Sequence, residues 1–105
     1  MGRGEVWLTA LDPTVGREIQ ETRPSIVVSP PEIHDHLKVV IVAPMTTGSR
    51  PAGFRVPLRF QERDGLVVLD QIRTVDKARL VKRLGRIDED VLDRVLAVLR
   101  DMFSR

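Results

Sequence analysis

Three short polar stretches of the sequence carry side chains suited to phosphate chemistry, and each adjoins an apolar run. Arg23-Pro24 precedes the run Ser25–Ser29, Thr46-Thr47 follows Val39–Ala43, and Asp70-Gln71 follows Gly65–Leu69. A guanidinium binds phosphate oxygens, a hydroxyl donates hydrogen bonds to them, and a carboxylate can accept a proton. Each stretch could therefore help to bind or cleave a phosphate-bearing group, but none of these signals is specific alone.

Each stretch also has a purely structural interpretation, and for single residues in isolation that interpretation is the favoured one. Arg23 has acidic partners within reach in Glu18 and Glu21, and a threonine after a strand often satisfies its own backbone in a turn. Asp70 has many nearby basic residues with which it could pair. The chemistry therefore rests on the three stretches acting together.

The sequence shows no cluster of metal-binding residues. There is no cysteine, and the two histidines, His34 and His36, flank Asp35 in a polar segment. Two histidines and one carboxylate at this spacing are weak evidence for a metal site, so we predict that both are solvent-exposed loop residues. We expect no metal and no cofactor. Histidines in an exposed loop argue against a histidine-pair ribonuclease, and the lack of a metal cluster argues against a two-metal nuclease.

Positive charge is concentrated in one segment, although the net charge of the chain is only +2. Between Arg73 and Arg86 there are six basic residues and one acid, Asp76, which gives +5 in fourteen residues. A local basic stripe indicates an anionic partner. The alternative, a solvated polar face, stays open from charge alone.

The apolar patterning predicts many short strands followed by one helix. The expected strands are 6–9, 25–29, 38–44, 54–58, 65–70, 72–75 and 80–87, with Asp64-Gly65 as a hairpin turn. Apolar residues then recur at helical spacing from Val91 to Phe103, and Asp88 is expected to cap that helix. This order favours a mostly β fold, a small antiparallel barrel or sandwich with a C-terminal helix.

Length and hydropathy limit the class of protein further. With 105 residues, the chain fits one domain, 1–105. We see no signal peptide behind Met1, and no apolar stretch approaches the ~18 residues of a membrane span. We therefore expect a cytoplasmic protein without a membrane partner.

The three polar stretches also resemble, in order and spacing, the motifs of the MazF/PemK/Kid family of toxins. The matching segments are Leu11–Glu18 with Arg23-Pro24, Ala43–Thr47, and Gln61–Gly65 continuing to Asp70–Thr74. The resemblance covers essentially the whole chain, including the closing helix. It implies an SH3-like barrel of the CcdB/MazF type that works as a homodimer. It also implies a toxin of a type II toxin–antitoxin pair, bound by a cognate antitoxin.

The activity implied by the resemblance is sequence-specific, metal-independent cleavage of single-stranded RNA, chiefly mRNA. The 2′-OH attacks the phosphate and leaves a 2′,3′-cyclic phosphate and a 5′-OH. The implied catalytic residues are Arg23, Thr46 and Glu18. For RNA binding we predict Thr47, Ser49, Asp70, Gln71, Arg73, Lys77 and Arg79.

One departure from the family bears on the general base. Asp70 matches an aspartate that the Kid branch uses as a base, but that branch carries an arginine where this chain has Val68. The Kid division of labour is therefore in doubt, and we favour Arg23 with Thr46. The alternatives are a non-catalytic inhibitor toxin like CcdB, and a nucleic-acid-binding barrel that does not cut.

Overall fold

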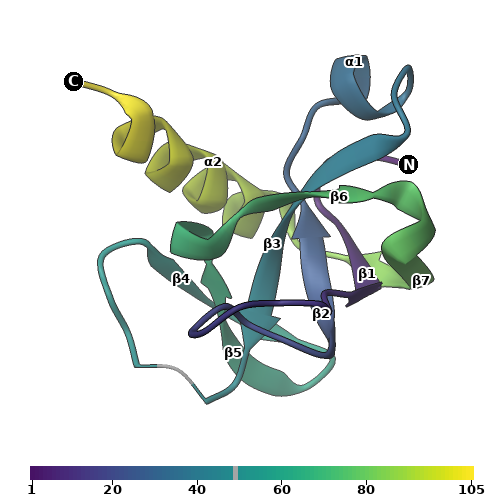
Figure 1. Cartoon of the computed structure of the whole chain (residues 1–105). Coiled ribbons are helices and arrows are strands. Elements are labelled where there is room, and N and C mark those ends of the chain that lie inside the picture. The colour runs from purple at the N-terminus through teal and green to yellow at the C-terminus, as the bar shows by residue number, and fades with distance from the viewer. Residues whose placement is uncertain (49) are drawn as a thin grey trace.

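A computed structural model describes residues 1–48 and 50–105. Within these residues, seven strands, two α-helices and two short 3₁₀ turns follow one another (Figure 1). They are β1 (Glu5–Ala10), β2 (Thr22–Val27), α1 (Pro31–His34), β3 (Val39–Thr46), β4 (Arg55–Phe60), β5 (Arg63–Val68), η1 (Leu69–Gln71), β6 (Arg73–Asp76), η2 (Lys77–Arg79), β7 (Leu80–Arg86) and α2 (Glu89–Phe103). All seven predicted strands and the predicted helix are present, with ends shifted by a few residues.

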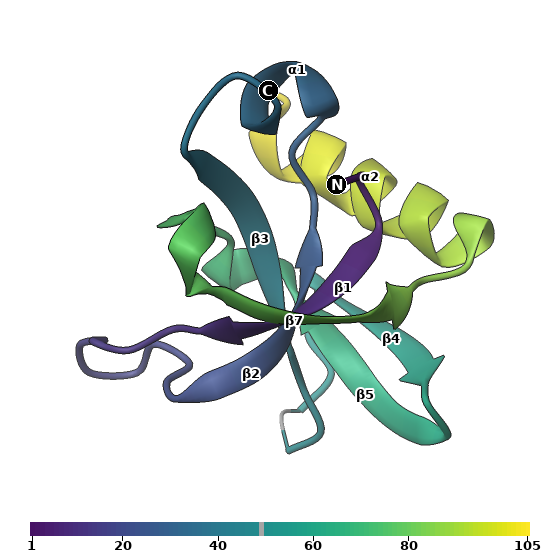
Figure 2. The same cartoon turned by 90° about the vertical axis from the view of Figure 1, so that its right-hand side faces the viewer.

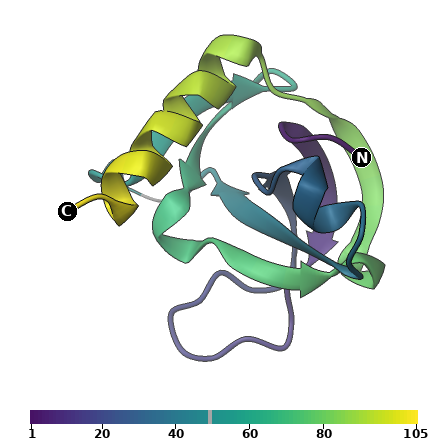
Figure 3. The same cartoon turned by 90° about the horizontal axis from the view of Figure 1, so that it is seen from above.

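The strands form one curled antiparallel sheet. Its order is β4-β5-β3-β2-β1-β7, and β6 pairs with β3 beside this path. Seen from above, the strands curl into a half-barrel, and α2 lies across one side (Figure 3). The predicted fold class, mostly β with a small antiparallel barrel and a C-terminal helix, is confirmed.

Alternate residues of β3 enter two separate apolar clusters. Ala43 and Met45 belong to the larger cluster, to which α2 contributes Val91, Leu92 and Val95. Val40 and Val42 belong to a smaller cluster on the other face of the sheet. Burying an aliphatic side chain of this size contributes about 1.5–3 kcal/mol. Packing on both faces of β3, on one face against α2, therefore holds the end of this strand in place.

The start of α2 agrees with prediction in position but not in detail. Asp88 occupies the N-cap position, yet its side chain makes no capping hydrogen bond. Glu89 and Asp90 lie in the first turn, where the helix dipole favours acidic side chains.

The predicted hairpin turn at Asp64-Gly65 is wrong, because both residues lie within β5. The chain turns at Gln61 and Glu62 instead, with φ of +49° and +64°. Positive φ at two successive positions defines a turn whose twist suits a two-residue hairpin. Gly65 meets a different need, since a Cβ there would lie 3.0 Å from the carbonyl oxygen of Thr46.

The prediction that His34 is exposed is also wrong, whereas His36 is exposed as expected. His34 lies in α1 and is fully buried. Its Nε2 is 3.1 Å from the carbonyl oxygen of Met1 and its Nδ1 is 3.0 Å from Ser29 Oγ. Because a carbonyl only accepts, Nε2 carries the proton and Nδ1 accepts from the serine hydroxyl. His34 thus ties the N-terminus to the β2–α1 connection.

Candidate active site

Arg23 reaches the site from the second position of β2. It is half-buried and lies opposite Thr9 of β1. Its Nε donates to the carbonyl oxygen of Gln20 at 3.2 Å. Within residues 1–48 and 50–105, no hydrogen bond or ion pair occupies its two terminal nitrogens. The alternative, a pairing of Arg23 with Glu18 or Glu21, is absent there, so its guanidinium can bind a ligand.

Thr46 ends β3 and Thr47 follows it, as the sequence predicts. Thr46 pairs with Leu66 of β5 and is half-buried, while Thr47 is exposed. The hydroxyl oxygen of Thr46 accepts a weak hydrogen bond from the backbone N–H of Gly48 at 3.3 Å. Its proton is therefore free to be donated elsewhere.

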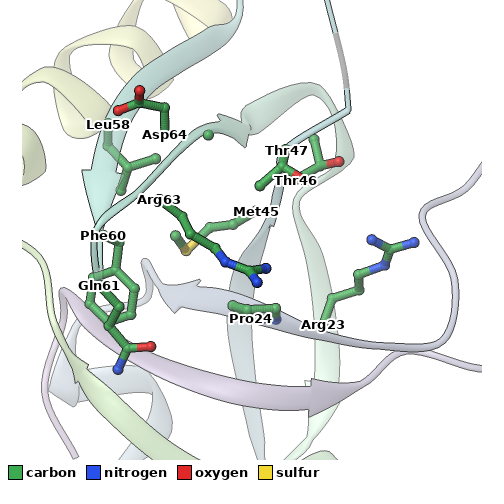
Figure 4. Close-up of a pocket in the computed structure, with 11 residues that line it drawn as sticks. Arg23, Pro24, Met45, Thr46, Thr47, Leu58, Phe60, Gln61, Arg63 and Asp64 are labelled. Atoms are coloured by element: carbon green, nitrogen blue, oxygen red, sulfur yellow. The ribbon is translucent and has the colours of Figure 1, made fainter.

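One open cavity of about 270 Å³ brings these residues together (Figure 4). It is lined by Arg23, Pro24, Met45, Thr46, Thr47, Leu58, Phe60, Gln61, Arg63, Asp64 and Gly65. We name it the arginine–threonine cavity. Guanidinium and hydroxyl groups occupy one side in Figure 4, and the apolar side chains of Met45, Leu58 and Phe60 occupy the other. Such a lining suits a ligand with a phosphate and a planar apolar part.

A second cavity, of about 230 Å³, holds the other predicted site residues. It is lined by Glu18, Ile19, Pro44, Asp70, Gln71, Ile72 and Arg73, and we name it the carboxylate cavity. Glu18 and Asp70 thus line a different cavity from Arg23. Pro44 of the carboxylate cavity and Met45 of the arginine–threonine cavity are adjacent in β3, so the two cavities lie on either side of that strand's end.

Gln71 uses its side-chain amide to hold the long β1–β2 loop. Its Oε1 accepts from the backbone N–H of Ile19 at 2.7 Å, and its Nε2 donates to the carbonyl oxygen of Arg17 at 3.4 Å. Glu18 lies between these two anchors, and its carboxylate accepts from the backbone N–H of Val15 at 2.8 Å. Figure 2 shows this loop extending sideways, away from the barrel.

Asp70 forms a two-pronged ion pair with Arg55 of β4. The Nε and Nη2 atoms of Arg55 each lie 3.2 Å from a carboxylate oxygen of Asp70. The hydrogen bond to Asp70 raises the pKa of Arg55. Arg55 lies directly opposite Val68 in the β4–β5 pairing. A guanidinium therefore reaches Asp70 from the neighbouring strand, although Val68 itself supplies none.

Three of the six basic residues in the stripe from Arg73 to Arg86 are engaged within the fold. Arg79 donates to the backbone carbonyls of Ala10 and Asp12, at the base of the β1–β2 loop. Arg83 lies 3.4 Å from Glu5, and Arg86 lies 3.0 Å from Glu89. Lys77 and Arg79 belong to η2 and line neither cavity, whereas Arg73 lines the carboxylate cavity. Ser49 lies outside the described residues.

Sequence reasoning missed Arg63, which lines the arginine–threonine cavity. The residue stood within the recognised motif, but the predicted turn at Asp64-Gly65 placed it in a solvent loop. A two-residue turn at Gln61-Glu62 puts Arg63 opposite Phe60 instead, at the start of β5.

The described residues contain no candidate metal-binding cluster and no candidate membrane-spanning helix. Among residues 1–48 and 50–105, no group of three or more histidine, cysteine, aspartate or glutamate residues is placed to hold a metal ion. In the same residues, no helix has the length and apolar character needed to cross a membrane.

Comparison with known proteins gives the chain a family. Residues 2–103 match the family described as "PemK-like, MazF-like toxin of type II toxin-antitoxin system". The chain is 44% identical to the Escherichia coli protein named endoribonuclease PemK, over 99% of this chain and 83% of that protein.

Solved structures share the fold. MazF from Deinococcus radiodurans superposes with a TM-score of 0.86 at 25% identity, covering 97% of this chain and 94% of that one. A mycobacterial endoribonuclease, solved in complex with its cognate antitoxin, gives a TM-score of 0.80 at 22% identity, covering 96% and 92%. With a family match over nearly its whole length, the chain belongs to the PemK-like, MazF-like toxins of type II toxin–antitoxin systems.

Proposed function

We propose that this toxin is an endoribonuclease that cleaves single-stranded RNA, chiefly mRNA, at a short sequence and without a metal. The observation that carries the proposal is the shared cavity of Arg23 and Thr46. Unoccupied guanidinium nitrogens and a free hydroxyl proton there face the same open space. The name of the PemK relative supports the same activity.

The proposed reaction uses the RNA's own 2′-OH as the nucleophile. The 2′ oxygen bonds to phosphorus and loses its proton to a base, while the bond from phosphorus to the 5′ oxygen breaks. That oxygen takes a proton, which leaves a 2′,3′-cyclic phosphate and a 5′-OH. Hydrogen-bond donors stabilise the charge that develops on the phosphate oxygens.

We assign to Arg23 and Thr46 the stabilisation of this developing charge. Because a guanidinium holds its proton tightly, Arg23 is better suited to stabilise the phosphate than to donate a proton. Thr46 donates its hydroxyl proton to a phosphate oxygen. Glu18, which lines the neighbouring carboxylate cavity, is the candidate for the base, and Asp70, Gln71 and Arg73 of the same cavity would contact the flanking RNA.

Cleavage is expected to persist in EDTA and to need the 2′-OH. The test incubates the purified protein with a long single-stranded RNA in excess EDTA, beside an all-deoxy strand of the same sequence. RNA should be cut to ends with a cyclic phosphate and a 5′-OH, and the deoxy strand should stay intact because it lacks the nucleophile. A requirement for magnesium, or equal cutting of the deoxy strand, would rule the mechanism out. Binding without cutting would favour a non-catalytic barrel.

The proposed partners are a second copy of the chain and an antitoxin. Apolar side chains left at the surface support protein contacts, since Phe103 is 73% exposed, Val81 60% and Phe54 48%. The mycobacterial relative was solved with its cognate antitoxin. We place this toxin in the cytoplasm, where the proposed substrate is found.

A homodimer is expected at micromolar concentration and below. A 105-residue domain has a small core, so association would bury further apolar surface. Sedimentation velocity over a dilution series gives the mass directly. A monomer at tens of micromolar protein would overturn this expectation, without bearing on whether the chain cuts RNA.

A further inference from the structure

Arg63 brings a second guanidinium into the arginine–threonine cavity. It is the first residue of β5, and it is exposed and lies opposite Phe60 across the hairpin. In Figure 4 its side chain extends into the cavity above Pro24, and its guanidinium points toward the side from which Arg23 enters. The two arginines come from strands that are not adjacent in the sheet, β5 and β2.

The charge of Arg63 is not compensated by a neighbouring acid. The next residue, Asp64, accepts a hydrogen bond from Arg59 at 3.3 Å, and Figure 4 shows its carboxylate turned away from Arg63. In the portion of the chain that the structure describes, Arg63 makes no ion pair and no side-chain hydrogen bond. Arg23 also has no acidic partner among these residues. Two guanidinium groups thus share one cavity with Asp64, whose carboxylate accepts from Arg59.

Two like charges in one cavity repel each other, and a bound anion removes that repulsion. The apolar side of the cavity, formed by Met45, Leu58 and Phe60, adds a surface for the face of a base. A ligand with both features is a nucleotide within a strand, which has a phosphate on each side of its base.

We propose that Arg63 binds the backbone phosphate next to the one held by Arg23, with the base of the nucleotide between them over Met45, Leu58 and Phe60. The proposal rests on the proposed function, since it assumes that RNA occupies this cavity. Arg63 then holds the substrate, and the bond that breaks lies at Arg23 and Thr46. Removing the Arg63 side chain should weaken RNA binding more than it slows the chemical step.

The test separates binding from chemistry with an RNA that has one 2′-deoxy nucleotide at the cleavage position and so cannot be cut. Dissociation constants are measured at several salt concentrations for the wild type, Arg63→Ala and Arg63→Lys. Arg94→Ala is the matched control, because Arg94 is exposed on α2 and lines neither cavity. KM and kcat are measured on the cleavable RNA. Circular dichroism checks that each variant is folded.

For Arg63→Ala we expect Kd and KM to rise about 10-fold at 0.15 M salt, with kcat within about threefold of the wild type. The slope of log affinity against log salt should become shallower by about one, because one phosphate contact is lost. Arg63→Lys should restore the slope and part of the affinity. Arg94→Ala should behave like the wild type.

The outcomes distinguish the two proposals. If the wild type cuts RNA but Arg63→Ala binds it with unchanged affinity and slope, the role of Arg63 is wrong and the proposed function stands. If Arg63→Ala loses only antitoxin binding and still binds RNA like the wild type, the role of Arg63 in RNA binding is likewise wrong and the proposed function stands. If the wild type binds RNA through Arg63 but never cuts it, the proposed function fails and the Arg63 contact stands. A loss confined to kcat would also overturn the assignment of Arg63 to binding.

Discussion

Replacing Arg23 with alanine is expected to lower the rate of RNA cleavage by about 10²–10³-fold, the loss typical of a missing donor to a developing oxyanion. The side chain offers two terminal nitrogens to the arginine–threonine cavity and uses only its Nε within the fold, in a bond to Gln20. Because it is half-buried at the start of a strand, its removal should leave the core and the unfolding midpoint nearly unchanged.

Single-turnover cleavage of a short RNA is the measurement, since it reports the chemical step. Thr46→Ala should show a loss of the same order, and Thr46→Ser should recover part of it by restoring the hydroxyl. Arg94→Ala serves as the control for removing one positive charge. If Arg23→Ala cleaves at the wild-type rate, the site has been placed on the wrong residues.

The largest expected effect on stability comes from His34→Ala, which should lower the free energy of unfolding by about 3 kcal/mol. The substitution removes a fully buried ring and leaves Ser29 and the Met1 carbonyl without their partner. A buried polar group that loses its partner costs about 1–3 kcal/mol, and the space left by the ring adds to this. For a domain of this size the melting temperature should fall by roughly 10–20 °C.

Urea unfolding of His34→Ala and His36→Ala side by side tests this prediction. His36 is exposed and makes no hydrogen bond within the described residues, so its substitution should change stability by less than about 0.5 kcal/mol. Below its melting temperature, folded His34→Ala should still cut RNA at close to the wild-type rate. A loss of cleavage in a fully folded His34→Ala would place the histidine in the reaction, contrary to our assignment.

The elements that could be predicted from the sequence are those specified by local patterns. The apolar run Val39–Ala43 fixes a central strand, and the helical spacing from Val91 onward fixes α2. The positions of Arg23 and Thr46 at strand ends follow from the same runs. Their grouping in one cavity was expected through the family motifs, because the order of strands in a sheet is not specified by any one segment.

The features that could not be predicted depend on distant contacts or on unusual backbone. The burial of His34 requires the Met1 carbonyl, which lies far away in the chain. The turn at Gln61-Glu62 uses positive φ at residues that rarely adopt it, so the Asp64-Gly65 pair misled the prediction. Glu18 lines the same cavity as Asp70, and not that of Arg23, because Gln71 holds the β1–β2 loop by hydrogen bonds to its backbone.

The hydrogen bonds from Gln71 to the β1–β2 loop bear on how the sequence of this toxin can change, by design or in evolution. Gln71 binds only backbone atoms of the loop, the N–H of Ile19 and the carbonyl of Arg17. Its two hydrogen bonds therefore do not depend on which side chains the loop carries. Its neighbour Asp70 is fastened separately, to Arg55. Exposed residues such as Val15 and Arg17 can therefore be exchanged without removing either of the two Gln71 hydrogen bonds. A library that randomises these positions and keeps Asp70-Gln71 intact would test whether this loop selects the RNA, on an unchanged scaffold.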